Sequence, residues 1–153
     1  MKFFLDENVN VGCLKPLEAL YGDHEFRHAY SEGLGGTKDV PLLNTLQQQG
    51  YDAIITKDRT QLRDEEERRA IFDAGLHWIG YVAKGVKGLR GLTTETATLT
   101  AGLVYVLADL RPEPHVYKLY GIGTEAAQRV KISAVGRPGW GRPRSQGLGL
   151  AGA

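Results

Sequence analysis

Two short apolar runs in this chain are each followed closely by an aspartate. The run at residues 3–5 leads directly into Asp6, and the run at 53–55 is followed three residues later by Asp58. In a parallel sheet with helical crossovers, the carboxyl ends of neighbouring strands share one edge. Carboxylates that gather at such an edge repel one another unless a cation joins them, and a hard divalent ion is the usual cation. The pattern therefore predicts a metal site at the edge of a parallel sheet.

The spacing of apolar and turn-forming residues predicts strands that alternate with helices. Strands are expected at 2–5, 24–28, 52–56, 77–82 and 115–121, and helices at 11–21, 38–49, 63–74 and 94–110. Glycines at 22, 50 and 75 are expected to end the first three helices, and Thr93 or Thr94 to cap the fourth. A further edge strand is expected at 129–135. This order predicts an α/β protein, a three-layer α/β/α sandwich with a largely parallel central sheet.

The length and composition are those of one globular domain. Hydrophobic residues make up 42% of the 153 residues and charged residues 24%, which suits a single core. We expect this domain at 1–135 and a disordered tail at 136–153, because glycine, proline and arginine dominate the tail. The longest apolar stretches are far too short to span a bilayer. The lone Cys13 permits neither an internal disulfide nor a thiolate zinc site, and it favours a cytoplasmic location.

Three aspartates are candidates for the metal site. Asp6 and Asp58 follow the first and third predicted strands, and Asp39 lies in the first turn of the second predicted helix. Each also has a plainer explanation, because aspartate often ends strands and the helix dipole favours an acid in a first turn. The spacing along the sequence leaves both explanations open.

Three motifs resemble those of the PIN and PIN-like domain nucleases, a group that includes the VapC-type toxins. They are Phe4-Leu5-Asp6-Glu7-Asn8, Thr37-Lys38-Asp39 at the start of a helix, and Ile54-Ile55-Thr56-Lys57-Asp58. The resemblance covers residues 1–82 well and the remainder only in its general layout. Its most specific part is an N-terminal strand that ends in Asp, combined with an apolar strand that ends in Thr-x-Asp.

This resemblance implies a magnesium- or manganese-dependent ribonuclease. Asp6, Asp39 and Asp58 would then bind the metal, and Thr56 would orient the site by hydrogen bonding. The reaction would be in-line attack of water on an RNA phosphodiester, with the metal lowering the pKa of the water and neutralising the leaving oxygen. Besides the RNA substrate, a small antitoxin protein and a second copy of the chain are the partners that the resemblance suggests.

The fourth carboxylate that PIN nucleases commonly carry after the next strand is missing here, since Gly80-Tyr81-Val82 contains no acid. Asp64 is a nearby substitute and Glu7 adjoins Asp6, so both are further ligand candidates. Asp64 is also well placed to cap the third helix, with Glu67 three residues on. The missing acid leaves open a second interpretation, a PIN-like binding module with weak catalysis or none.

Basic residues are expected to form a rim near the ends of the third and fourth strands. Such a rim would hold RNA phosphates without reading the bases. The candidates are Lys57, Arg59, Arg63, Lys84, Lys87 and Arg90.

A third interpretation is a receiver-like phosphoacceptor domain, which also carries acids after its first and third strands. Such a domain needs a Ser or Thr after its fourth strand and a Lys after its fifth. Gly80 and Gly121 stand near those places in this sequence, so the nuclease interpretation is preferred.

Overall fold

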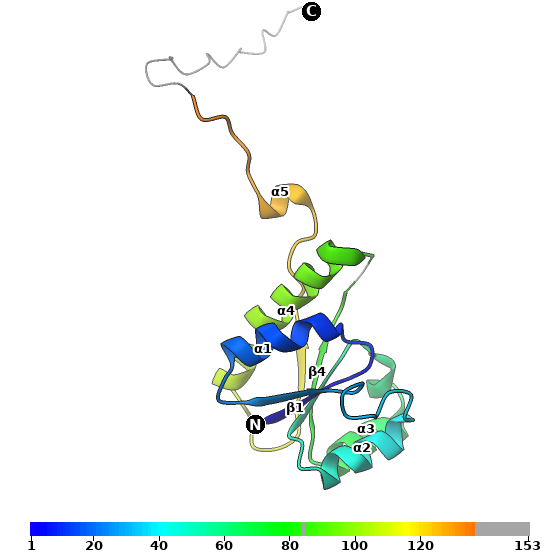
Figure 1. Cartoon of the computed structure of the whole chain (residues 1–153). Helices are drawn as coiled ribbons and strands as arrows, with labels where there is room; N and C mark the ends of the chain where they lie inside the picture. Colours follow the sequence, from blue (N-terminus) through cyan, green and yellow to red (C-terminus); the bar gives the residue numbers. More distant parts are fainter. Residues whose placement is uncertain (84, 137–153) are drawn as a thin grey trace, which may run out of the picture.

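The computed structural model describes residues 1–83 and 85–136, and it shows a sheet with helices on both faces (Figure 1). Five parallel strands form the sheet in the order β2-β1-β3-β4-β5. They are β1 (Lys2–Leu5), β2 (Glu25–His28), β3 (Ala53–Thr56), β4 (His77–Tyr81) and β5 (Val116–Leu119). This architecture confirms the predicted α/β fold with a parallel central sheet.

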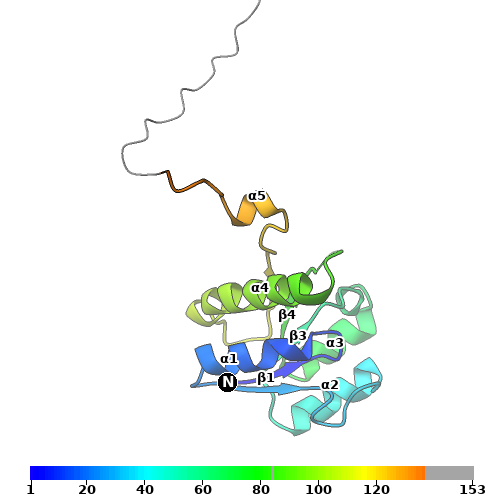
Figure 2. The ribbon, with the colours of Figure 1, turned by 45° about the horizontal axis from the view of Figure 1, so that its top comes forward.

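Helices cover both faces of the sheet, as Figure 2 shows. One face carries α1 (Leu14–Leu20) and α4 (Gly88–Ala108), and the other carries α2 (Asp39–Gln48) and α3 (Glu65–Asp73). Short 3-10 turns precede two of the helices, η1 (Val11–Cys13) before α1 and η2 (Thr60–Leu62) before α3. A four-residue helix, α5 (Ala126–Arg129), follows β5 and buries none of its residues.

The alternation of side chains along the strands decides where the candidate site lies, because successive side chains point to opposite faces. In β1, Leu5 packs against α1 and α4, whereas Phe4 packs against α2 and α3. β3 follows the same alternation, and both strands are buried on both faces, as central parallel strands are. Continued by one residue, the alternation places Asp6 on the side of α2 and α3, at the carboxyl edge of the sheet.

The first helix is shorter than predicted. Residues 11–13 form a 3-10 turn, so α1 begins at Leu14 and accommodates Pro16 in its first turn. Tyr21 is the C-cap, and Gly22 does not adopt the left-handed conformation that was expected to end the helix. Glycines 50 and 75 do adopt positive φ values directly after α2 and α3 and confirm the other two predicted ends.

The fourth helix begins at Gly88 rather than at residue 94, so the predicted cap at Thr93 or Thr94 is wrong and both threonines lie inside α4. Glycine usually marks a turn or a loop rather than the interior of a helix. Gly91 has a different role, because α4 passes so close to Val86 that a Cβ at Gly91 would lie 2.4 Å from the Val86 carbonyl oxygen. Packing therefore requires the glycine that sequence rules assign to a turn.

The predicted edge strand at 129–135 is wrong, because α5 ends at Arg129 and residues 130–135 form no strand. The tail predicted at 136–153 lies outside the described residues apart from Gly136, and so does Lys84. Within the part of the chain that the structure describes, no helix has the length and apolar character needed to cross a bilayer.

Candidate metal and RNA site

Asp6 stands just past the carboxyl end of β1, with only 7% of its surface exposed. Its Oδ1 accepts the backbone N–H of Glu7 at 2.8 Å, and its Oδ2 accepts hydrogen bonds from Thr56 Oγ1 at 2.7 Å and Asn8 Nδ2 at 3.0 Å. Burial raises the pKa of Asp6, the hydrogen bonds from the Thr56 hydroxyl and the Glu7 backbone oppose that rise, and the negative charges of Glu7 and Asp39 add to it. Asp6 is thus a fixed, buried carboxylate among other carboxylates.

The fully buried hydroxyl group of Thr56 joins the ends of β1 and β3. Besides donating to Asp6, it accepts the backbone N–H of Asp58 at 3.0 Å and the side-chain amide of Asn8 at 3.1 Å. The Oδ1 of Asn8 in turn accepts the backbone N–H of Lys57 at 3.0 Å. One hydroxyl group therefore holds Asp6 and the backbone of Asp58 at the same edge of the sheet.

Asp58 lies half-buried beyond β3, where it begins the turn that leads into η2. Its Oδ1 accepts the backbone N–H of Thr60 at 2.8 Å and the Thr60 hydroxyl at 2.6 Å, an arrangement typical of aspartate in a turn. Its Oδ2 takes no hydrogen bond from the described residues. One oxygen of Asp58 is therefore engaged by the turn, and the other is available to a ligand.

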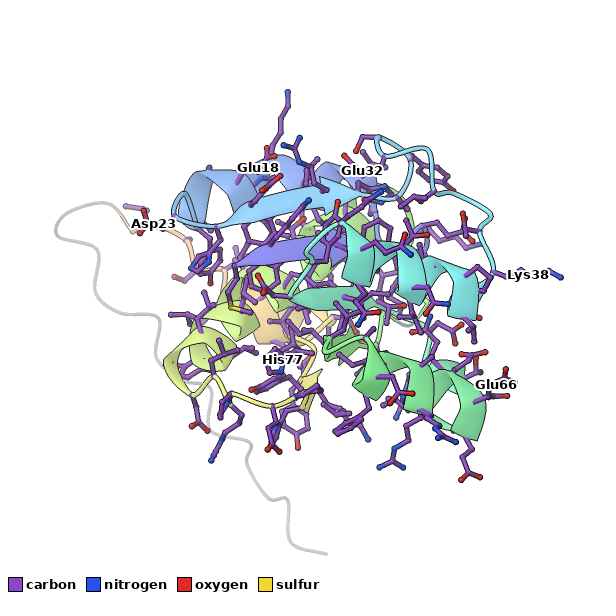
Figure 3. All side chains as sticks on the ribbon, turned by 90° about the horizontal axis from the view of Figure 1, so that it is seen from below. Glu18, Asp23, Glu32, Lys38, Glu66 and His77 are labelled. Carbon is purple, nitrogen blue, oxygen red and sulfur yellow. The ribbon has the colours of Figure 1, made fainter. Side chains whose placement is uncertain are left out.

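Asp39 opens α2 on the same side of the sheet. Figure 3 shows Lys38 and Glu66 at the starts of α2 and α3, and both face the same side of the molecule. The Oδ1 of Asp39 accepts Gln61 Nε2 at 3.1 Å, and Gln61 Oε1 accepts the indole N–H of Trp78 at 3.1 Å. Because Gln61 and Trp78 are each 1% exposed, a buried chain of hydrogen bonds ties Asp39 to β4.

Glu67 is a carboxylate of the same neighbourhood, although the sequence suggested it only as a partner of the Asp64 cap. Asp64 does cap α3, since its Oδ1 accepts the backbone N–H of Glu67 at 3.0 Å. The Glu67 side chain lies beside Asp39, and its Oε2 is buried without a hydrogen-bond partner among the described residues. Burial first, then the charge of Asp39 and the hydrogen bond that a protonated Glu67 makes with Asp39, raise the pKa of Glu67 to about 7, with smaller contributions from Asp64 and Asp58.

These carboxylates influence one another without forming a closed cage. Asp39 raises the pKa of both Asp6 and Glu67, and Asp58 raises that of Glu67. Within residues 1–83 and 85–136, no three or more His, Cys, Asp or Glu side chains are arranged to hold a metal ion. Mg²⁺ is commonly held by one or two carboxylates together with waters and substrate phosphates. The oxygen donors and the unpartnered Glu67 Oε2 therefore fit a divalent cation, although not a complete protein cage.

The missing fourth acid has a steric explanation on β4. Gly80 pairs with Thr56 in the register of β3 and β4, next to the carboxylates. A Cβ at Gly80 would lie 1.9 Å from the indole ring of Trp78, which covers this place on the sheet. A carboxylate at position 80 would have to displace the tryptophan.

A buried acid does occur at this edge on the opposite face, where α4 places Glu95. Its Oε1 pairs with Lys57 Nζ at 3.2 Å and accepts the Tyr81 hydroxyl at 2.5 Å and the backbone N–H of Asn10 at 3.1 Å. Burial and the hydrogen bond to Glu95 raise the pKa of Tyr81, which keeps its hydroxyl protonated as the donor. Glu95 thus ties the end of β4, the residue after β3 and the start of η1 to α4, and Lys57 is engaged in an internal ion pair.

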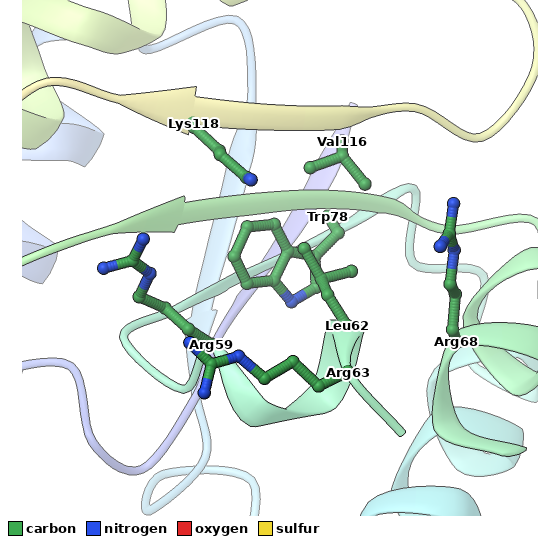
Figure 4. Close-up of a pocket in the computed structure, with 7 residues that line it drawn as sticks. All are labelled: Arg59, Leu62, Arg63, Arg68, Trp78, Val116 and Lys118. Atoms are coloured by element: carbon green, nitrogen blue, oxygen red, sulfur yellow. The ribbon is translucent and has the colours of Figure 1, made fainter. Parts of the chain in front are cut away.

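The other predicted basic residues occupy different surfaces. Arg59 and Arg63 line a pocket of about 420 Å³ beside Trp78 (Figure 4). Lys87 and Arg90 are exposed at the start of α4, where Arg90 donates to the carbonyl oxygen of Thr124 at 3.4 Å. The described members of the predicted set therefore form no continuous rim, because two line the pocket and two lie at the start of α4.

Glu7 is exposed and supports the loop that leads into α2. Its Oε2 accepts the backbone N–H of Gly36 at 2.6 Å. This bond anchors the glycine-rich loop to the end of β1, so Glu7 positions the segment that carries Asp39.

Sequence reasoning missed several residues of the site. Glu67 could have been found from its position in the first turn of an acid-capped helix, which faces the same edge as Asp39. Gln61, Arg68 and Lys118 gave no signal, because their roles depend on distant partners and on the shape of the pocket.

The chain was compared with known protein families, curated proteins and solved structures. The family model described as a PIN-like domain matches residues 1–81, which is more than half of the 153 residues. The matched segment contains β1 to β4 and Asp6, Asp39, Asp58 and Glu67. The searches of curated proteins and of solved structures give no match. The match over more than half of its length shows that this chain belongs to the PIN-like domain family.

Proposed function

We propose that this protein is a metal-dependent ribonuclease that cleaves RNA phosphodiesters. The observation that carries the proposal is the junction at Thr56, whose hydroxyl group binds Asp6 and the backbone of Asp58 at the carboxyl edge of the sheet. Asp39 and Glu67 lie on the same side, and the charge of Asp39 raises the pKa of both Asp6 and Glu67. Membership of a family of nuclease-type domains supports the same activity.

Asp6, Asp39 and Asp58 would hold Mg²⁺ or Mn²⁺. When bound, such an ion activates water and neutralises negative charge on the phosphate that is cleaved. Thr56 and Asn8 fix the Asp6 carboxylate by hydrogen bonds, so its orientation does not depend on the substrate. A hydrogen bond from the Gln61 side chain likewise fixes the Asp39 carboxylate.

The experiment compares Asp6→Asn and Asp58→Asn with the wild type in an RNA cleavage assay. Cleavage is measured with Mg²⁺ or Mn²⁺, after addition of a chelator, and after restoration of the metal. Asp23→Asn is the matched control, because Asp23 is exposed and lies before β2, at the amino ends of the strands. We expect loss of cleavage in the two site variants, unchanged circular dichroism in all of them, and normal cleavage in the control.

A non-catalytic binding module is the second candidate function, favoured by the absence of a closed carboxylate cage in the described residues. Wild-type protein that binds RNA but never cleaves it, with either metal, would support that function.

We further propose that the ribonuclease is the toxin of a toxin–antitoxin pair. Growth arrest on expression, relieved by a protein encoded in an adjacent small gene, would support a role as the toxin of a toxin–antitoxin pair.

A further inference from the structure

A groove follows β4 and β5 on the face that carries α2 and α3. Its middle is the cavity of about 420 Å³, flanked by two cavities of about 140 Å³ each. One neighbour shares Arg59, Trp78 and Lys118 with the middle cavity, and the other shares Leu62, Arg68 and Val116 with it. Because the three cavities share walls, they form one continuous depression, which we call the β4–β5 groove.

The charge of the β4–β5 groove is positive. Arg59, Arg63, Arg68 and Lys118 line it, and no carboxylate belongs to its walls. Figure 4 shows Lys118 on one side of the Trp78 indole, with Arg59 and Arg63 on the other. No ion pair or side-chain hydrogen bond joins any of the four cations to another described residue. Four cations without internal partners favour an anionic ligand.

Aromatic and apolar side chains accompany these charges. Tyr120 lines one end of the groove with 96% of its surface exposed, and Phe72 lines the other end with 63% exposed. Leu62 and Val116 form an apolar wall in the middle. Cations that track a backbone, with aromatic side chains on which bases stack, are the combination that binds single-stranded nucleic acid.

The groove also leads to the candidate metal site. Its Tyr120 end includes Gly80, which pairs with Thr56 in the sheet. Arg59, which lines the groove, directly follows Asp58 in the chain. The buried bond between Trp78 and Gln61 connects the floor of the groove to Asp39.

We infer that the β4–β5 groove binds one single strand of RNA as it leaves the candidate metal site, with phosphates on the cations and a base stacked on Tyr120. This inference rests on the proposed function and names the surface of this chain that holds its substrate. A duplex keeps its bases stacked inside the helix, so it can reach the cations but cannot place a base on Tyr120. The groove therefore selects unpaired RNA.

The test is direct binding of a short fluorescent RNA of mixed sequence, single-stranded or annealed to its complement. All proteins carry Asp6→Asn and are kept in chelator, so binding is measured without cleavage. The double variant Arg63→Ala/Lys118→Ala removes two groove charges. Its matched control, Lys15→Ala/Arg27→Ala, removes two exposed charges on α1 and β2, away from β5 at the other edge of the sheet. Tyr120→Ala is compared with Tyr120→Phe, which keeps the ring.

We expect the groove double variant to bind the single strand at least tenfold more weakly. The slope of log affinity against log salt should fall by about 1.4, at about 0.7 for each lost phosphate contact. Tyr120→Ala should lose roughly tenfold, whereas Tyr120→Phe and the control should bind as the parent does. Equal binding by the groove variant and the control, or duplex binding as tight as single-strand binding, would overturn the inference.

The groove inference and the proposed function can fail independently of each other. If the Asp6→Asn protein still cleaves RNA but the groove variants bind poorly, the metal-site proposal fails and the groove inference stands. If Asp6→Asn abolishes cleavage but the groove variants bind normally, the proposed function stands and the groove inference fails.

Discussion

Thr56 donates a hydrogen bond of 2.7 Å to Asp6 across two neighbouring parallel strands. The same hydroxyl group accepts the backbone N–H of Asp58, two residues further along the chain. A buried threonine that joins two carboxylate-bearing segments can set the orientation of both. The Thr-x-Asp motif therefore has a physical basis at its first position as well as at its last.

Thr56→Val is expected to reduce metal-dependent cleavage by roughly 10- to 100-fold, the usual effect of removing a group that orients a ligand. Valine keeps the branched shape in β3 but cannot donate to Asp6, so the pKa of Asp6 should rise further. Cleavage should recover partly as pH increases. Thr56→Ser, which keeps the hydroxyl group, is the control. Initial rates across a pH series provide the measurement, and a Thr56→Val profile identical to that of the wild type would contradict this role.

Glu67→Gln is expected to change how stability depends on pH. The pKa of Glu67 is about 7 in the folded protein, against the ordinary value of 4.5. The folded state therefore binds more protons than the unfolded state between these values, and the free energy of unfolding falls as pH rises from 4.5 to about 7. Glu67→Gln has no carboxylate at this position to ionise, so its free energy of unfolding does not fall in this way as pH rises. The variant should melt near the wild type at pH of about 4 and at a higher temperature than the wild type at pH of about 8.

Glu66→Gln is the matched control for that experiment, because Glu66 is the exposed neighbour on α3 (Figure 3). Thermal melts at both pH values provide the measurement. Mg²⁺ added at the higher pH should raise the melting temperature of the wild type more than that of Glu67→Gln. If both glutamate variants shift the melts equally, the desolvation of the half-buried Glu67 carboxylate has no special effect on stability.

The sequence predicts the sheet better than it predicts the site. β1 and β3 are short apolar runs, so the local pattern locates them, and the helices predicted between successive strands indicate a parallel sheet. α4 was placed too late because Gly91 is needed for close packing against Val86, a contact that no local rule contains. The edge strand at 129–135 failed because alternating apolar residues there find no neighbouring strand.

In the candidate site, too, residues next to strands could be predicted, whereas residues whose roles depend on distant contacts could not. Asp6 and Asp58 could be predicted because they directly follow strands whose carboxyl ends share an edge. Lys57 was expected among the RNA-binding cations, but it forms an ion pair with Glu95, which lies far away in the sequence. The groove cation Lys118 comes from the last strand, so only the order of strands in the sheet brings it near Arg59.

Gln61→Met is expected to destabilise the protein and to loosen Asp39. Methionine fills a similar volume but leaves the buried indole N–H of Trp78 without its acceptor, which costs about 1–3 kcal/mol. Asp39 also loses its bond from Gln61. Urea unfolding measures the stability, and Gln48→Met, at an exposed position of α2, is the control. Unchanged stability and an unchanged metal requirement for cleavage would contradict this positioning role.

Gly80→Ala is expected to cost about 1–3 kcal/mol of stability by overpacking. The added methyl group would lie 1.9 Å from the Trp78 ring, so the indole must move from its place over β4 into the β4–β5 groove. Gly121→Ala is the control, because its nearest neighbour would be at an ordinary 3.7 Å. Urea unfolding measures the loss of stability. Tryptophan fluorescence measures the movement of the Trp78 indole, in a Trp140→Phe background so that Trp78 is the one tryptophan in the chain. The variant should also bind single-stranded RNA more weakly, because the displaced ring occupies the groove. Stability and fluorescence equal to those of the control would show that Trp78 does not hold this position.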